Sequence, residues 1–172
     1  WVGDTCPGAS DVAVFNGTDT SNAVINANTT VGGIQIDAAY TGTIATAAGV
    51  EVTVDAQGFT QAGGTFTAPP SFILSGNFTR TGGTFTHSSG TVTLRTLNAS
   101  TITFSPGTSL TLYDLMLDRG DVNAGTVTLA GDFTVAHDFT LQTDRSDGSA
   151  LTLNADGTAR TVTVEGALRA PS

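Results

Sequence analysis

The stretch FTQAGGTFT at 59–67 is repeated as FTRTGGTFT at 78–86, nineteen residues later, with seven of nine positions identical. A fixed period of about twenty residues is typical of solenoids, in which each coil buries its apolar side only against its neighbours. The repeat therefore predicts that equivalent residues of the two copies are neighbours in adjacent coils.

The aromatic and glycine positions of the repeat make this prediction specific. We expect Phe59 to stack on Phe78 and Phe66 on Phe85. We expect the two double glycines, 63–64 and 82–83, to stack at a corner, because glycine accepts the positive φ angles of tight turns.

Short segments outside the repeat alternate apolar and polar residues, as half-buried strands do. They are DVAVF (11–15), GIQI (33–36), VEVTV (50–54), TVTL (91–94), TITF (101–104), LTL (110–112), TVTL (126–129), LTL (151–153) and TVTV (161–164). The chain has 32 threonines and 21 glycines, which favour strands and turns respectively. No segment shows a helical pattern, and SLTLYDLMLDR (109–119) is expected to form two strands with a corner at 113–114.

These patterns predict an all-β fold, a right-handed parallel β-helix with irregular coils of about 19–25 residues and roughly seven or eight coils in total. A Greek-key β-sandwich is the alternative. The length of 172 residues indicates a single domain, 1–172. Within it we expect a leader or cap at 1–30 and β-coils over 31–170.

The charge of the chain excludes some partners. It has no lysine, and six arginines against fifteen acidic residues give a net charge of −9. Nucleic-acid binding needs a basic surface, so nucleic acid is not expected as a partner. No apolar run reaches the roughly 20 residues of a membrane-spanning helix, so no membrane span is expected.

Several segments carry a family resemblance. They are PGASDVAVFN (7–16), VGGIQIDAAYTGTI (31–44), SGNFTRTGGTFTHSSGTVTL (75–94), TSLTLYDLMLDRG (108–120) and VTLAGDFTVAHDFTL (127–141). Together they resemble repetitive exported bacterial surface proteins of the autotransporter or adhesin type, with β-helical stalks. The resemblance implies an extracellular or cell-surface location and a structural or adhesive role, and it carries over no catalytic residue.

Candidate chemistry in the sequence is sparse, and we expect no catalytic residue and no cofactor. His87 and His137 are the only histidines, and both are interpreted as solvated loop residues because zinc needs three or four convergent ligands. Asp144 and Asp147 could hold a calcium ion, although a polar turn explains them equally well. The other aspartates are interpreted as turn formers.

Three further signals depend on exposure. Arg119-Gly120-Asp121 spells a cell-binding tripeptide, for which chance is the simpler explanation. Four asparagines lie in glycosylation sequons: Asn16, Asn28, Asn77 and Asn98. Paired threonines suggest ice binding, but only the pairs beginning at 65 and 84 keep the coil period, so we interpret them as outward strand positions.

The last expectation is self-association, because a stack of β-coils ends in unpaired strand edges. The candidate residues are Trp1, Val2, Val162, Val164 and Leu168, with Cys6 as a possible intermolecular thiol. The sequence thus favours a non-enzymatic structural subunit of an extracellular bacterial filament, stalk or matrix that associates head to tail with itself. An adhesive module that binds glycans or ice, and a carbohydrate-active β-helix enzyme, are the alternatives.

Overall fold

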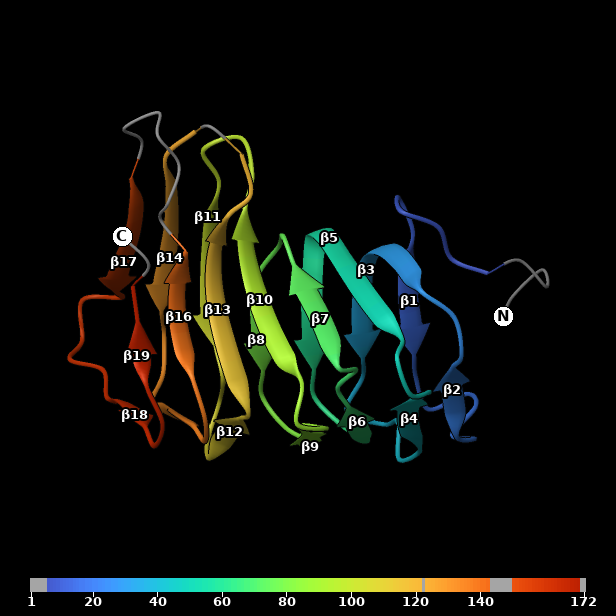
Figure 1. Cartoon of the computed structure of the whole chain (residues 1–172). Helices are drawn as coiled ribbons and strands as arrows, with labels where there is room; N and C mark the ends of the chain where they lie inside the picture. The colour runs from blue at the N-terminus through green and yellow to red at the C-terminus, as the bar shows by residue number, and fades with distance from the viewer. Residues whose placement is uncertain (1–5, 122, 143–149, 171–172) are drawn as a thin grey trace.

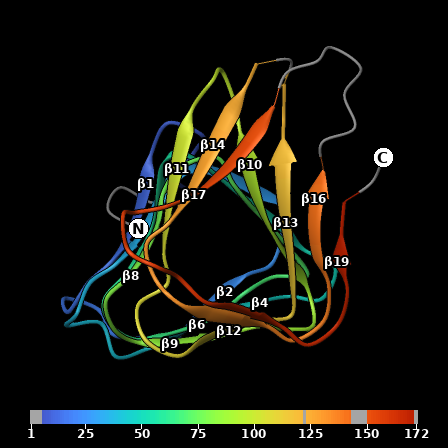
Figure 2. The same cartoon turned by 90° about the vertical axis from the view of Figure 1, so that its left-hand side faces the viewer.

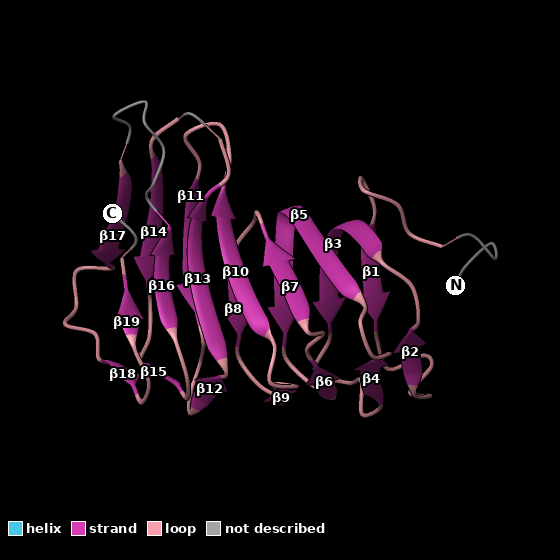
Figure 3. Ribbon diagram, viewed as in Figure 1, coloured by secondary structure: helices cyan, strands magenta, loops and turns pink. Residues whose placement is uncertain are grey.

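The computed structural model describes residues 6–121, 123–142 and 150–170. In these residues the chain is all-β and has no helix (Figure 3). The strands are arranged along one axis, with the first described strands at one end and the last described strands at the other (Figure 1). Among the described residues there is accordingly no helix long and apolar enough to cross a membrane.

The coils stack into a prism with three faces, seen along its axis in Figure 2. Face A contains the first parts of β3 (Thr29–Ile36) and β5 (Glu51–Gln61), then β7 (Ser71–Leu74), β10 (Thr91–Thr96), β13 (Asp114–Arg119), β16 (Phe139–Gln142) and β19 (Leu168–Arg169). Face B contains β1 (Val12–Phe15), the second parts of β3 and β5, then β8 (Phe78–Arg80), β11 (Thr101–Ser105), β14 (Gly125–Leu129) and β17 (Leu151–Ala155). Face C contains β2 (Ala23–Ile25), β4 (Thr43–Thr46), β6 (Thr65–Thr67), β9 (Thr84–Thr86), β12 (Leu110–Leu112), β15 (Phe133–Val135) and β18 (Val162–Val164).

All strand pairs are parallel, so the fold is a β-solenoid and not a Greek-key sandwich. In Figure 2 the chain runs anticlockwise from β17 to β18 to β19 while it advances towards the viewer, which makes the solenoid right-handed. It has about six turns, fewer than expected. The reason is that the later coils are longer: the step between paired residues is 19 from Phe66 to Phe85 but 29 from Phe139 to Leu168.

The repeat in the sequence is a repeat in space. Phe59 pairs with Phe78 in register and their rings stack with centroids 5.1 Å apart. Phe66 pairs with Phe85, with ring centroids 5.7 Å apart. These rings fill the middle of the prism, so the predicted stacking is confirmed.

The double glycines also stack as predicted. Thr84 N donates to Gly64 O at 2.8 Å, which places Gly83 directly beside Gly63 and Gly64. Gly83 has a φ of 68°, and a Cβ there would lie 2.3 Å from the carbonyl oxygen of Gly63. Any other residue would therefore be strained both by its φ and by this contact.

The N-terminal boundary of the coils lies earlier than the predicted start at residue 31. β1 already pairs with β3, and β2 pairs with β4, in parallel registers. Residues 12–25 therefore belong to the first coil. By contrast, the predicted corner at 113–114 is where β12 ends and β13 begins.

Candidate functional site

An aromatic column runs up the corner between faces C and A. It consists of His87, Tyr113 and His137, which follow β9, β12 and β15 within two residues. The centroid of the Tyr113 ring lies 5.7 Å from that of His87 and 5.0 Å from that of His137. The Tyr113 and His137 rings are nearly parallel, at 14°, so three successive coils contribute one stack.

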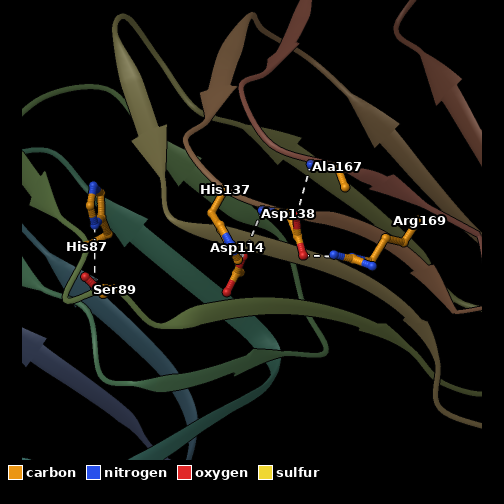
Figure 4. Close-up of polar contacts among 7 residues, drawn as sticks. All are labelled: His87, Ser89, Asp114, His137, Asp138, Ala167 and Arg169. Atoms are coloured by element: carbon orange, nitrogen blue, oxygen red, sulfur yellow. Dashed lines mark hydrogen bonds and ion pairs between the residues drawn. The ribbon is translucent and has the colours of Figure 1, made fainter.

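Two aspartates lie beside this column and join three coils (Figure 4). Asp114 Oδ1 is 2.8 Å from His137 Nδ1 and accepts the backbone N–H of Asp138 at 2.9 Å. Asp138 Oδ1 accepts the N–H of Ala167 at 3.0 Å, and its Oδ2 accepts Arg169 Nε at 2.7 Å. Each aspartate thus binds a backbone amide of the following coil.

The strand register explains why these groups meet. Leu115 pairs with Phe139, and Phe139 with Leu168, so the residues preceding them, Asp114, Asp138 and Ala167, form one column. The position next to His137 in the following coil is Gly166, where a Cβ would lie 2.3 Å from the His137 carbonyl oxygen. Glycine is therefore the residue that this corner admits.

The electrostatics stabilise the ionised form of Asp138. The hydrogen bond from Arg169, followed by the amide of Ala167, holds the pKa of the Asp138 carboxyl below its usual value of 3.8. The Asp138 carboxylate is consequently charged at neutral pH and pairs with the exposed guanidinium of Arg169. This pair fastens β19 to β16.

Asp114, His137 and Asp138 are also the described residues that could together hold a metal ion, since one ligand atom from each lies within 4.8 Å of the others. However, their oxygens already accept two amides, an imidazole and a guanidinium. Among the described residues, Asp114 is the side chain that hydrogen-bonds to His137. The geometry is that of a structural joint between coils.

The same joint recurs at other corners. A side-chain oxygen of Asn or Asp accepts a backbone N–H of the following coil in the pairs Asn22–Thr43, Asn28–Glu51, Asn77–Thr103 and Asp132–Thr161. Others close turns within one corner, as in Asn16–Thr18, Asp19–Ser21 and Asp156–Thr158. Asp19 and Asp156 thus form turns, as expected for the aspartates from the sequence. That side chains of asparagine and aspartate also connect successive coils was not predicted.

The four sequon asparagines, Asn16, Asn28, Asn77 and Asn98, are all exposed. For Asn28 and Asn77 the side-chain oxygen is the acceptor of a cross-coil bond. The amide nitrogen, which a glycan would modify, is the other atom of the same group.

The tripeptide at 119–121 is not presented as a cell-binding loop. Arg119 ends β13 and is only 1% exposed, the largest of the fully buried side chains. A receptor needs the guanidinium at the surface, so the structure corrects this candidate. The sequence could not show it, because three residues do not reveal which face of a strand they occupy.

The residues predicted for self-association lie partly in the described chain. Leu168 is 65% exposed, whereas Val162 and Val164 are half-buried against the core. Cys6 is an exposed free thiol at the opposite end, where it lines an apolar cavity of about 240 Å³. Trp1 and Val2, and the calcium candidates Asp144 and Asp147, lie outside the described residues.

Threonines form longer ranks than the sequence spacing indicated. On face B, two columns run in register across β11, β14 and β17: Thr101–Thr126–Thr152 and Thr103–Thr128–Asn154. The expectation that only the pairs at 65 and 84 keep the coil period was therefore wrong. The step of 25 residues between Thr101 and Thr126 hides the alignment, because the extra residues lie in the connecting loops.

No protein-family model matches the chain, and searches of curated proteins and of solved structures also find no match.

Proposed function

We propose that the chain is a non-enzymatic structural subunit of an extracellular bacterial filament, stalk or matrix, whose copies associate end to end through the edges of their sheets. The observation that supports this most directly is the distribution of exposed apolar side chains. The large exposed ones among the described residues are Val14, Val24, Leu153 and Leu168. Two belong to the first coil and two to the last, and none lies on the sides of the prism between them.

The backbone at both ends supports the same proposal. β1 and β2 pair on one side only, and so do β17 and β18, within the described part of the chain. Such edges present rows of N–H and C=O groups that can pair with another chain. A second copy offers strands of the same direction and spacing.

The interior is also open at the first coil. The apolar lining of the cavity of about 240 Å³ includes Phe15, Ala23, Val24 and Ile25, which are half-buried or exposed. Inside the prism a strand is covered on both sides, as Phe66 is by Ile44 and Phe85. Covering the cavity with another copy would remove this apolar surface from water.

Sedimentation velocity over a hundredfold range of concentration, with electron microscopy of the same samples, tests the proposal. We expect the sedimentation coefficient to rise with concentration and the images to show rods of constant width. A stable joint should bury about 800 Å² per partner. A single monomeric species across the whole range would refute the proposal.

A second candidate is an adhesive module that binds a glycan or ice. The threonine ranks across β11, β14 and β17 favour it, because they align polar side chains of three successive coils with about 4.8 Å between strands. Glycan-array binding and ice-recrystallisation assays, with Thr126→Lys as the variant, test it. Binding that survives this substitution would not come from the ranks.

A further inference from the structure

We infer that the copies join head to tail, with β17 and β18 of one copy pairing with β1 and β2 of the next. The head is defined here as the outer edges of β1 and β2, and the tail as the outer edges of β17 and β18. This inference rests on the proposed end-to-end association and adds its polarity and its strands.

The side-chain pattern of the two ends agrees in phase. In β18, Val162 and Val164 pack against the core while Thr163 is exposed. In β2, Ala23 and Ile25 pack against the core and Val24 is 65% exposed. β18 laid on β2 in phase therefore continues the apolar interior without exposing a core residue.

Strand direction selects the same polarity. Every pair of neighbouring strands in the prism is parallel. A second copy can continue these parallel pairs on more than one face only if it is placed further along the same axis in the same orientation. A head-to-head contact would reverse the strands of one copy. The joint would then pair strands antiparallel, unlike every ladder in the prism.

Charge also disfavours the head-to-head contact. Residues 1–79 contain six acidic residues and no basic one, and all six arginines lie in 80–172. The described part of the first coil carries Asp11 and Asp19, both exposed. The described last coil, 150–170, carries Arg160 and Arg169 against Asp156 and Glu165, so its formal charges cancel. Head-to-head contact brings carboxylates together, whereas head-to-tail contact brings them against an end with no net charge.

The hydrogen bonds show which residues form the free edges. Ala47 N donates to Ile25 O, so Ile25 faces β4. Because alternate residues of a strand face opposite neighbours, Val24 directs its N–H and C=O away from β4. At the tail, Ala150 O and Asp156 N bond to β14, so Ala155 likewise faces the open side.

Two proline variants test the inference, because proline removes the N–H and is tolerated on an edge strand. Val24→Pro blocks the head and Ala155→Pro blocks the tail, and both side chains are exposed. Val24→Thr and Ala155→Ser keep the N–H and serve as matched controls. Circular dichroism and thermal unfolding verify that each variant is folded. Cys6 is exposed and lines the cavity, so coupling it to a bulky maleimide provides a second head-blocked protein with unaltered strands.

Head-to-tail joining predicts that each proline variant alone is monomeric, that a 1:1 mixture gives a heterodimer and nothing larger, and that both controls polymerise. Dimers of Ala155→Pro alone would indicate head-to-head joining, and dimers of Val24→Pro alone tail-to-tail joining. Either result would overturn the inference while leaving end-to-end association intact. Polymers of both variants would overturn the assignment of these edges, and a monomeric native chain would overturn the proposed function itself.

Discussion

Replacing Phe59 by alanine tests whether the repeated aromatics form the centre of the core. Phe59 is fully buried, and its ring contacts four others. The centroid distances are 5.0 Å to Phe66, 5.5 Å to Phe72, 5.1 Å to Phe78 and 6.1 Å to Phe85.

The magnitude follows from these contacts. A buried Phe→Ala change costs about 3–5 kcal/mol through lost burial and the cavity left behind. Each favourable ring pair contributes about 0.5–1.5 kcal/mol beyond burial, and four pairs are lost, so we expect the upper part of the range, about 4–5 kcal/mol. Because domains are stable by about 5–15 kcal/mol, the variant should be close to unfolding.

Urea unfolding followed by far-ultraviolet circular dichroism measures the change. Phe59→Leu keeps most of the volume and should lose only about 1–1.5 kcal/mol, which gives a reading even if the alanine variant does not fold. Thr60→Ala, at the exposed neighbouring position, should change stability by less than about 0.5 kcal/mol. A loss below about 1 kcal/mol for Phe59→Ala, with an unchanged slope against urea, would show that Phe59 is not packed as described.

Three further predictions concern other parts of the molecule. Gly83→Ala should destabilise the chain more than Gly49→Ala in urea unfolding, because both have positive φ but only Gly83 lacks room for a Cβ; equal losses would contradict this. Asp138→Asn should be less stable than the native chain at neutral pH, and the difference should shrink as the pH falls below 3.8, since the native carboxyl has a lowered pKa and loses its bond to Arg169 on protonation; a difference that does not change with pH would contradict the ion pair. A bulky maleimide on Cys6 should abolish end-to-end association, whereas unlabelled Cys6→Ser should associate normally in sedimentation experiments.

Cys6 cannot reinforce a head-to-tail joint. It is the only cysteine in the sequence, and it lines the cavity at the first coil. A disulfide between copies would join two Cys6 residues and therefore two first coils. Oxidised dimers would thus have blocked heads, which is the opposite of a reinforced filament.

The sequence by itself determined the strands and the stacking of the central coils. Alternation of apolar and polar residues is a local property, because successive side chains of a strand point to opposite faces. The copies at 59–67 and 78–86 can also be aligned from the sequence alone, because equivalent positions stay nineteen residues apart throughout both copies. The pairs of Phe59 with Phe78 and of Phe66 with Phe85 could therefore be predicted from spacing alone.

Only the tertiary structure decided the alignments that cross loops of unequal length. His87, Tyr113 and His137 form one column although they are 26 and 24 residues apart, and Thr101 lies beside Thr126 at a step of 25. The sequence did contain a clue, because each of these three rings follows a strand of face C within two residues. The lengths of the coils, which are needed to align those strands, could not be read from the sequence. The burial of Arg119 was equally hidden. The physical reason is that a parallel register is set when a whole coil closes on the one before it, and the residues that absorb differences in coil length are loop residues with no periodic pattern of their own.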